Sequence, residues 1–334
     1  MNLETNKIYE GDVIEVLKTF PDESIDCIVT SPPYYGLRDY GVAGQIGLEP
    51  TLQEYLSKMI AVTAELKRVL KSTGTLWWDH GDSYGGSSNG AGDTTSTNRS
   101  KPESYKQMYK GQKPGKQQGI PDKCLLLQAH RLAIRMIDEQ CWILRNTIIW
   151  EKPNAMPSSV KDRFSVNYEP LFFFSKSKKY YFEPQYEDYA PSSDVRYRQA
   201  LRANKEYDTK ALYRSNTPYA NYKRGQGTVK ARQNVDPTNI LVVGGNNIGR
   251  NKRCVWKIPT QPYPEAHFAV FPKALVETPI KAGCPPNGIV LDPFAGSGTT
   301  LEVARTLGRQ YIGIELSKEY IKLAEKRFSQ IKLL

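Results

Sequence analysis

The chain has 334 residues and a formal net charge of +11, with 39% hydrophobic and 24% charged residues. These proportions permit a sizeable buried core, and no run of about 18 apolar residues suggests a membrane span. The N-terminus lacks the features of a signal peptide, and the five cysteines have no C-x-x-C spacing that would indicate a zinc site or a disulfide framework. We therefore expect a cytoplasmic protein without a metal site.

Strands and helices alternate in the first part of the chain. Residues 7–10 and 25–29 are strand candidates. Apolar residues recur at helical spacing over 52–70, which predicts an amphipathic helix, and residues 75–79 predict another strand. This alternation of strand and helix is typical of a parallel α/β sheet.

A segment of different composition follows. Residues 81–119 are rich in Gly, Ser and Lys and have no periodicity, so they are either a functional lid or disordered. We expect a mobile loop at the active face. Regularity then returns, with a helical stripe from 125 to 137 and strands at 142–150 and 171–174.

The charge is concentrated in residues 176–253, which hold 16 Lys and Arg residues against 7 Asp and Glu residues, with nine tyrosines among them. Lys and Arg pair with phosphates, and aromatic rings can stack on bases. The composition therefore favours a nucleic-acid partner. A solvated basic loop region is the alternative reading of the same charge.

The C-terminal part is again regular. Residues 288–292 predict a strand, 293–300 a Gly-rich turn, 301–307 a helix and 311–315 another strand. Ser317 is a candidate N-cap for a closing helix.

The Gly-rich turn has the composition of a ligand-binding loop. Gly296 and Gly298 would let ligand atoms approach the backbone, and Glu315 could accept hydrogen bonds from ribose hydroxyls. A P-loop would need a Lys after Gly298, and a dinucleotide motif would need a third Gly at Leu301. Neither residue is present, which argues against both motifs. The turn alone is compatible with a site for another nucleotide-like ligand and with a turn that binds no ligand.

Two motifs together resemble a known family. D-P-F-A-G-S-G-T-T at 292–300 resembles the S-adenosylmethionine motif of amino-group DNA methyltransferases, and T-S-P-P-Y at 30–34 resembles their catalytic motif. The catalytic motif comes first, as in the β class, whose fold is circularly permuted. Three other segments also resemble the family: Gly11-Asp12, Trp150-Glu151-Lys152 and residues 267–272. The resemblance makes His267 a candidate for lining the cofactor pocket.

The resemblance implies a Rossmann-like, doubly wound α/β fold with a mostly parallel, seven-stranded methyltransferase sheet. In the permuted order, strand 7–10 should lie beside strand 311–315, and strand 288–292 beside strand 25–29. Both motifs would then flank one crevice at the C-terminal ends of the strands. The implied organisation is a catalytic half at 1–175, a target-recognition region at 176–253 and a cofactor-binding half at 254–334.

The resemblance also implies site residues. The catalytic candidates are Ser31, Pro32, Pro33 and Tyr34. The S-adenosylmethionine candidates are Asp12, Thr30, Phe271, Asp292, Pro293, Phe294, Gly296, Gly298, Thr299, Thr300 and Glu315. The candidate DNA contacts are Arg38, Lys152, Arg196, Arg198, Arg202, Arg214, Lys223, Arg224 and Arg232.

By analogy with the family, Ser31 and the Pro32 carbonyl accept hydrogen bonds from the exocyclic amino group of a flipped base, and Tyr34 stacks on that base. The methyl group then moves by direct displacement. A thiol mechanism has no support, because the only adjacent Cys and Pro residues, Cys284-Pro285, stand in the reverse of the usual order. The three histidines show no metal spacing, which argues against a zinc deaminase.

Ser31 favours cytosine N4 over adenine N6 as the target within this family. Double-stranded DNA is the expected partner, and a homodimer and a cognate restriction endonuclease are compatible with the resemblance. A non-catalytic nucleic-acid-binding module with the same fold, or an enzyme acting on RNA or protein glutamine, is the alternative.

Overall fold

The computed structural model describes residues 3–85, 120–188, 250–261 and 271–329. The chain divides into two compact units, Met1–Glu183 with Cys254–Leu334, and Pro184–Arg253. The first unit contains the central sheet and all of the site described below.

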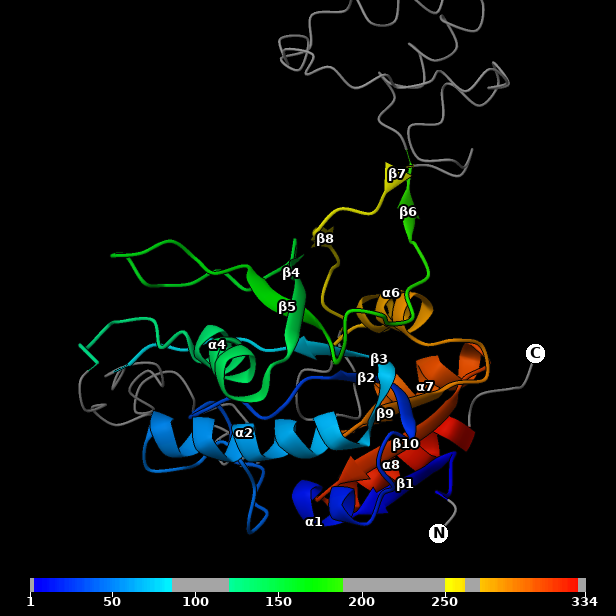
Figure 1. The fold of residues 1–334 in the computed structure, drawn as a ribbon. Helices are drawn as coiled ribbons and strands as arrows, with labels where there is room; N and C mark the ends of the chain where they lie inside the picture. The colour runs from blue at the N-terminus through cyan, green and yellow to red at the C-terminus, as the bar shows by residue number, and fades with distance from the viewer. Residues whose placement is uncertain (1–2, 86–119, 189–249, 262–270, 330–334) are drawn as a thin grey trace, which may run out of the picture. The chain divides into compact units, whose positions relative to one another are not determined.

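The sheet has eight strands in the order β1-β10-β9-β2-β3-β5-β4-β8 (Figure 1). Only β5 runs antiparallel to its neighbours, so the predicted mostly parallel α/β sheet is confirmed. The predicted count of seven strands is wrong, because β8 adds a strand too short to show a periodic pattern. The strands are β1 (Lys7–Glu10), β2 (Ile25–Thr30), β3 (Leu70–Asp79), β4 (Ile143–Glu151), β5 (Tyr168–Ser175), β8 (Val255–Lys257), β9 (Ile289–Asp292) and β10 (Gln310–Glu315).

The strand neighbours expected for the permuted order are present. β1 pairs with β10 in parallel, with Glu10 opposite Glu315. β9 lies between β10 and β2, with Val290 opposite Cys27. The ends of β2 and β9, from which the two motifs leave the sheet, are therefore adjacent.

Helices cover both faces of the sheet, as in a doubly wound fold. The side chains alternate along the strands: Trp78 belongs to the core on one face, and Trp77 to the core on the other. The first core includes residues of α1 (Val13–Lys18), α2 (Leu52–Val69) and α4 (Gln128–Gln140). The second includes residues of α6 (Lys273–Gly283) and α7 (Thr299–Thr306), with Phe328 of α8 (Lys318–Ser329) packed against it.

The described part of the second unit is small. Its strands β6 (Tyr186–Glu187) and β7 (Arg250–Asn251) pair in antiparallel fashion, and Glu187 forms ion pairs with Arg250 and Arg253. This unit spans Pro184–Arg253, and the bounds 176–253 of a target-recognition region stay a prediction.

Several predicted features lie outside the described residues. They are residues 86–119 of the expected mobile loop, His267, and seven of the candidate DNA contacts: Arg196, Arg198, Arg202, Arg214, Lys223, Arg224 and Arg232. The role of the basic region in target recognition stays a prediction. Among the described helices, none combines the length and apolar character that crossing a membrane requires.

Candidate active site

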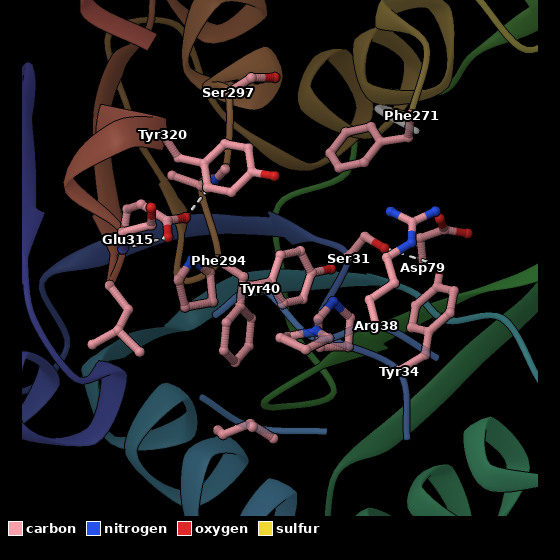
Figure 2. A pocket seen from close by; sticks show the side chains of 18 of the residues that line it. Ser31, Tyr34, Arg38, Tyr40, Asp79, Phe271, Phe294, Ser297, Glu315 and Tyr320 are labelled. Carbon is pink, nitrogen blue, oxygen red and sulfur yellow. Dashed lines mark hydrogen bonds between the residues drawn. The ribbon is translucent and has the colours of Figure 1, made fainter. Parts of the chain in front are cut away.

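A cavity of about 660 Å³ opens at the C-terminal ends of the central strands. Figure 2 shows Ser31, Tyr34 and Asp79 toward one end and Glu315 with Tyr320 toward the other, with Tyr40 between them. The two motifs therefore contribute to one cavity. The predicted residues that line it are Asp12, Ser31, Pro32, Pro33, Tyr34, Arg38, Lys152, Phe271, Pro293, Phe294, Gly296, Thr299 and Glu315.

The Gly-rich turn and the end of β10 form the Glu315 end of the cavity. Gly296 adopts a φ of 51°, in the left-handed region that favours glycine. Its backbone N–H donates to Glu315 Oε2 at 2.7 Å, and the Ser317 N–H donates to Oε1 at 2.8 Å. Burial raises the pKa of Glu315 above its ordinary value, and these two donors only partly offset this effect. A carboxylate has about four acceptor positions, so Glu315 can still accept a hydrogen bond from a ligand hydroxyl.

A buried carboxylate joins the two motifs beneath the cavity. Asp292 accepts hydrogen bonds from Thr30 Oγ1 at 2.7 Å and from Thr300 Oγ1 at 2.6 Å. Burial raises the pKa of Asp292 to about 6. Thr30, Asp292 and Thr300, all predicted to bind the cofactor, do not line the cavity but connect β2, β9 and α7.

Gly298, another candidate for cofactor binding, does not line the cavity and lies against α8. A Cβ atom at this residue would lie 2.9 Å from the Ala324 Cβ atom of α8. Its φ of 78° places it in the left-handed region just before α7. The absence of a side chain at Gly298 therefore lets α8 approach the turn.

The hydroxyl groups of the catalytic motif form a directional chain. Tyr34 Oη donates to Glu169 Oε2 at 3.3 Å and lies 3.0 Å from Ser31 Oγ. Burial raises the pKa of Tyr34 well above its ordinary value, with a further contribution from Glu169, so the phenol keeps its single proton. Because that proton goes to Glu169, Ser31 must be the donor in its bond to Tyr34. Both lone pairs of Ser31 Oγ are then available as acceptors.

A buried histidine supports this motif from below. The indole N–H of Trp78 donates to His80 Nδ1 at 3.2 Å, so the ring proton is on Nε2. Nε2 lies 3.1 Å from Tyr55 Oη, which donates to the Pro33 carbonyl at 2.9 Å. The His80 ring also stacks on the Tyr34 ring, with centroids 5.1 Å apart. Burial lowers the pKa of His80 to about 3, so this arrangement holds a neutral imidazole.

Two acidic residues that line the cavity, Asp79 and Glu169, were not among the predicted site residues. Asp79 ends β3, is 4% exposed, and its Oδ1 has no hydrogen-bond partner among the described residues. Burial, with a contribution from Glu169, raises the pKa of Asp79 well above its usual range. Glu169 lies near the start of the neighbouring antiparallel strand and forms an ion pair with Lys152 at 2.5 Å. Asp79 could have been selected from the sequence, because it is a carboxylate at the end of a predicted strand.

Aromatic side chains that the sequence analysis did not select complete the Glu315 end of the cavity. Tyr40 and Tyr320 both line it, with ring centroids 6.3 Å apart in an edge-to-face arrangement. The Tyr40 backbone N–H donates to Gln45 Oε1 at 2.7 Å, which fixes the loop after the catalytic motif. Together with Phe294, these rings offer apolar surface to a planar ligand.

An arginine of α8 braces the Gly-rich turn. Arg327 is 9% exposed and donates to the Ser297 carbonyl at 3.1 Å and to Thr299 Oγ1 at 2.7 Å. Its Nε lies 3.2 Å from Glu302 Oε2, and Lys273 pairs with the other oxygen of Glu302 at 2.5 Å. The network connects α6, α7 and α8 around the turn.

We expect Arg327→Met to lower the free energy of unfolding by about 3 kcal/mol, because it leaves Glu302 partly uncompensated and two acceptors unpaired. Urea denaturation measures this change. The double variant Arg327→Met/Glu302→Gln should recover part of the loss, since the buried charge is removed with its partner. Strictly additive effects of the two substitutions would contradict the coupling.

No metal centre is evident in the described part of the chain. Its residues include no group of three His, Cys, Asp or Glu side chains placed to hold a metal ion. All five cysteines are free, and Cys27 and Cys284 are buried.

This fold and cavity define a Rossmann-like methyltransferase. A family model described as DNA methylase, of the N6 and N4 type, matches residues 25–326. The chain belongs to this family and is an S-adenosylmethionine-dependent DNA methyltransferase.

Individual relatives agree with this assignment. The chain is 38% identical to the Type II methyltransferase M.XycI of Xanthomonas campestris pv. cyanopsidis, over 97% of this chain and 88% of that protein. It is 36% identical to the Type II methyltransferase M.SmaI of Serratia marcescens, over 98% and 91%.

Solved structures share the fold. The PvuII DNA methyltransferase (cytosine-N4-specific) matches with a TM-score of 0.59 and 21% identity, over 99% of this chain and 89% of that one. The putative DNA modification methylase TTHA0409 of Thermus thermophilus, complexed with S-adenosyl-L-methionine, matches with a TM-score of 0.54 and 22% identity, over 97% and 93%.

Proposed function

We propose that this enzyme methylates the exocyclic N4 of a cytosine that has been flipped out of duplex DNA. The observation that carries the proposal is the hydroxyl chain from Ser31 through Tyr34 to Glu169. Because Ser31 directs its own proton to Tyr34, Ser31 Oγ can only accept hydrogen bonds from a ligand, and an exocyclic amino group is a donor that such an oxygen can hold.

The cofactor end suits S-adenosylmethionine. The volume of about 660 Å³ lies within the usual range for ligand pockets. Glu315 presents carboxylate oxygens for ribose hydroxyls, Tyr320 and Phe294 present apolar faces for a purine, and the start of α7 presents backbone N–H groups for a carboxylate. When bound there, S-adenosylmethionine supplies an electrophilic methyl group.

The protein residues then act by position and electrostatics. Ser31 Oγ and the Pro32 carbonyl accept the two N–H bonds of the amino group, which weakens the conjugation of its lone pair with the ring. The Tyr34 ring, stacked on His80, offers a face to the extruded base. The mechanism requires no covalent bond between enzyme and base.

The choice of cytosine rests on Ser31, because a serine in this position is commoner in N4-cytosine enzymes than in N6-adenine ones. Adenine N6 is the alternative and uses the same contacts. Both Ser and Asp can accept one N–H bond, so the acceptor capacity of Ser31 does not by itself select cytosine over adenine.

Nucleoside mass spectrometry decides between the two bases. We expect DNA incubated with the enzyme and S-adenosylmethionine to yield N4-methylcytosine after digestion to nucleosides. N6-methyladenine instead would overturn the cytosine assignment and leave the mechanism intact. Methylation of RNA or protein with none in DNA would remove the proposal altogether.

The organisation of the enzyme in the cell forms part of the same proposal. The Type II names of the relatives support a restriction–modification role, beside an endonuclease that cuts the same sequence. We place this role in the cytoplasm. We propose a homodimer, by analogy with the β class. Sedimentation velocity of the purified protein tests the oligomeric state, and a purely monomeric species would contradict it.

A further inference from the structure

The loop between β4 and β5, residues 153–167, exposes large apolar side chains. Phe164 is 96% exposed, Met156 is 90% exposed, and Val160 and Val166 are 40% and 49% exposed. Figure 1 shows this loop extending beyond the ends of β4 and β5. Single exposed apolar residues need no explanation, but a group of four on one loop marks an interaction surface.

The loop begins and ends at the cavity. Lys152 and Asn154 on one side and Glu169 on the other all line it. The base of the loop is fixed, because the Lys152 N–H donates to the Asn167 carbonyl at 2.7 Å. Asn154 also exchanges two hydrogen bonds with the backbone of Thr260, at 3.0 and 2.9 Å. A group that binds at this end of the cavity therefore lies close to the base of the loop.

The charge of the loop favours a polyanion. Lys161 and Arg163 are exposed, and Asp162, the single acidic residue of 153–167, is paired with Lys123 at 2.7 Å. The Arg163 guanidinium lies 3.8 Å from the Tyr84 ring centroid. These two contacts hold the segment that precedes Phe164, so the ring is presented on a supported backbone.

We propose that the tip of this loop is a wedge for duplex DNA. Phe164 and Met156 enter the base stack beside the target nucleotide, while Lys161 contacts a backbone phosphate. Apolar side chains inserted between base steps partly unstack them, which lowers the cost of extruding a base. This inference rests on the proposed function, since it assumes that the substrate base leaves the duplex.

The test compares two duplexes that carry the site methylated by the wild-type enzyme. One is fully paired, and in the other the target base is mispaired, so that less free energy is needed to extrude it. We expect Phe164→Ala to lower kcat/KM on the paired duplex at least about tenfold and to lower it much less on the mispaired duplex. Met156→Ala should show the same pattern more weakly.

Ile134→Ala is the matched control, because Ile134 is 56% exposed on α4 and does not line the cavity. It should leave both rates unchanged, and calorimetric affinity for S-adenosylmethionine should be unaffected in all three variants. Wild-type rates for Phe164→Ala on the paired duplex, or equal losses on both duplexes, would overturn the wedge.

A partner other than DNA has a different signature. If Phe164→Ala changed the sedimentation coefficient of the free protein and left kcat/KM intact, the loop would be a protein interface and the proposal would fail. Failure of the proposed function is separate, because it would appear as an absence of methylated nucleosides with the wild-type enzyme.

Discussion

Replacement of Ser31 by alanine should lower kcat at least about 100-fold, a loss comparable to that of one preorganised hydrogen bond to a reacting group. Ser31 lies toward one end of the cavity and Glu315 toward the other (Figure 2). Affinity for S-adenosylmethionine should therefore stay within about twofold of the wild type. Single-turnover methylation with excess enzyme and calorimetric titration of the cofactor measure the two quantities.

Two further variants sharpen the interpretation. Tyr34→Phe keeps the ring but removes the acceptor of the Ser31 proton, so its loss should be smaller than that of Ser31→Ala. Ser57→Ala, at an exposed position of helix α2, is the control and should have no effect. Undiminished turnover of Ser31→Ala would refute the role given to this side chain, whichever base proves to be the substrate.

Mild acid should destabilise the protein through His80. Burial lowers the pKa of this imidazole from 6.5 to about 3. Below pH 6.5 the unfolded chain binds a proton at His80 and the folded chain does not, so the free energy of unfolding falls as the pH falls. The contribution is about 1.4 kcal/mol for each pH unit until the folded pKa is reached.

Comparison with a variant isolates this effect. Asp292 opposes it, because a carboxyl whose folded pKa is raised to about 6 gains relative stability as the pH falls from 6. The useful quantity is therefore the difference in unfolding free energy between the wild type and His80→Gln, measured by urea denaturation. We expect this difference to shrink by about 2 kcal/mol between pH 6.5 and 5. A difference independent of pH would show that His80 does not remain neutral in the folded protein.

The strands and long helices could be predicted because their patterns are local. The apolar run of β2 and the helical stripe of α2 are visible in consecutive residues. Helix α1 has six residues and α6 contains Pro279, so neither shows a clear helical signal, and the three residues of β8 show no period at all.

The site was predictable only where it is contiguous in the chain. Ser31 and Glu315 belong to motifs that carry their own signal. Asp79 and Glu169 come together because β5 runs antiparallel to β3, with Asp79 opposite Leu171. That pairing depends on the packing of the whole sheet, which no single stretch of sequence specifies. For the same reason, the sequence could not show that Asp292 is buried beneath the cavity while its neighbours Pro293 and Phe294 line it.

The pairing of β1 with β10 also affects how the protein folds during its synthesis. The Thr5 hydroxyl donates a hydrogen bond to Gln310 Oε1, 305 residues away in the sequence. Strand β9, which lies between β10 and β2, is also synthesised late. A nascent chain therefore carries its catalytic motif long before the centre of the sheet can close, and it exposes the edges of β1 and β2 in the meantime. Contacts this distant in sequence slow folding and expose strand edges to aggregation. Methyl transfer should thus begin only after β9 and β10 have left the ribosome and paired with β2 and β1.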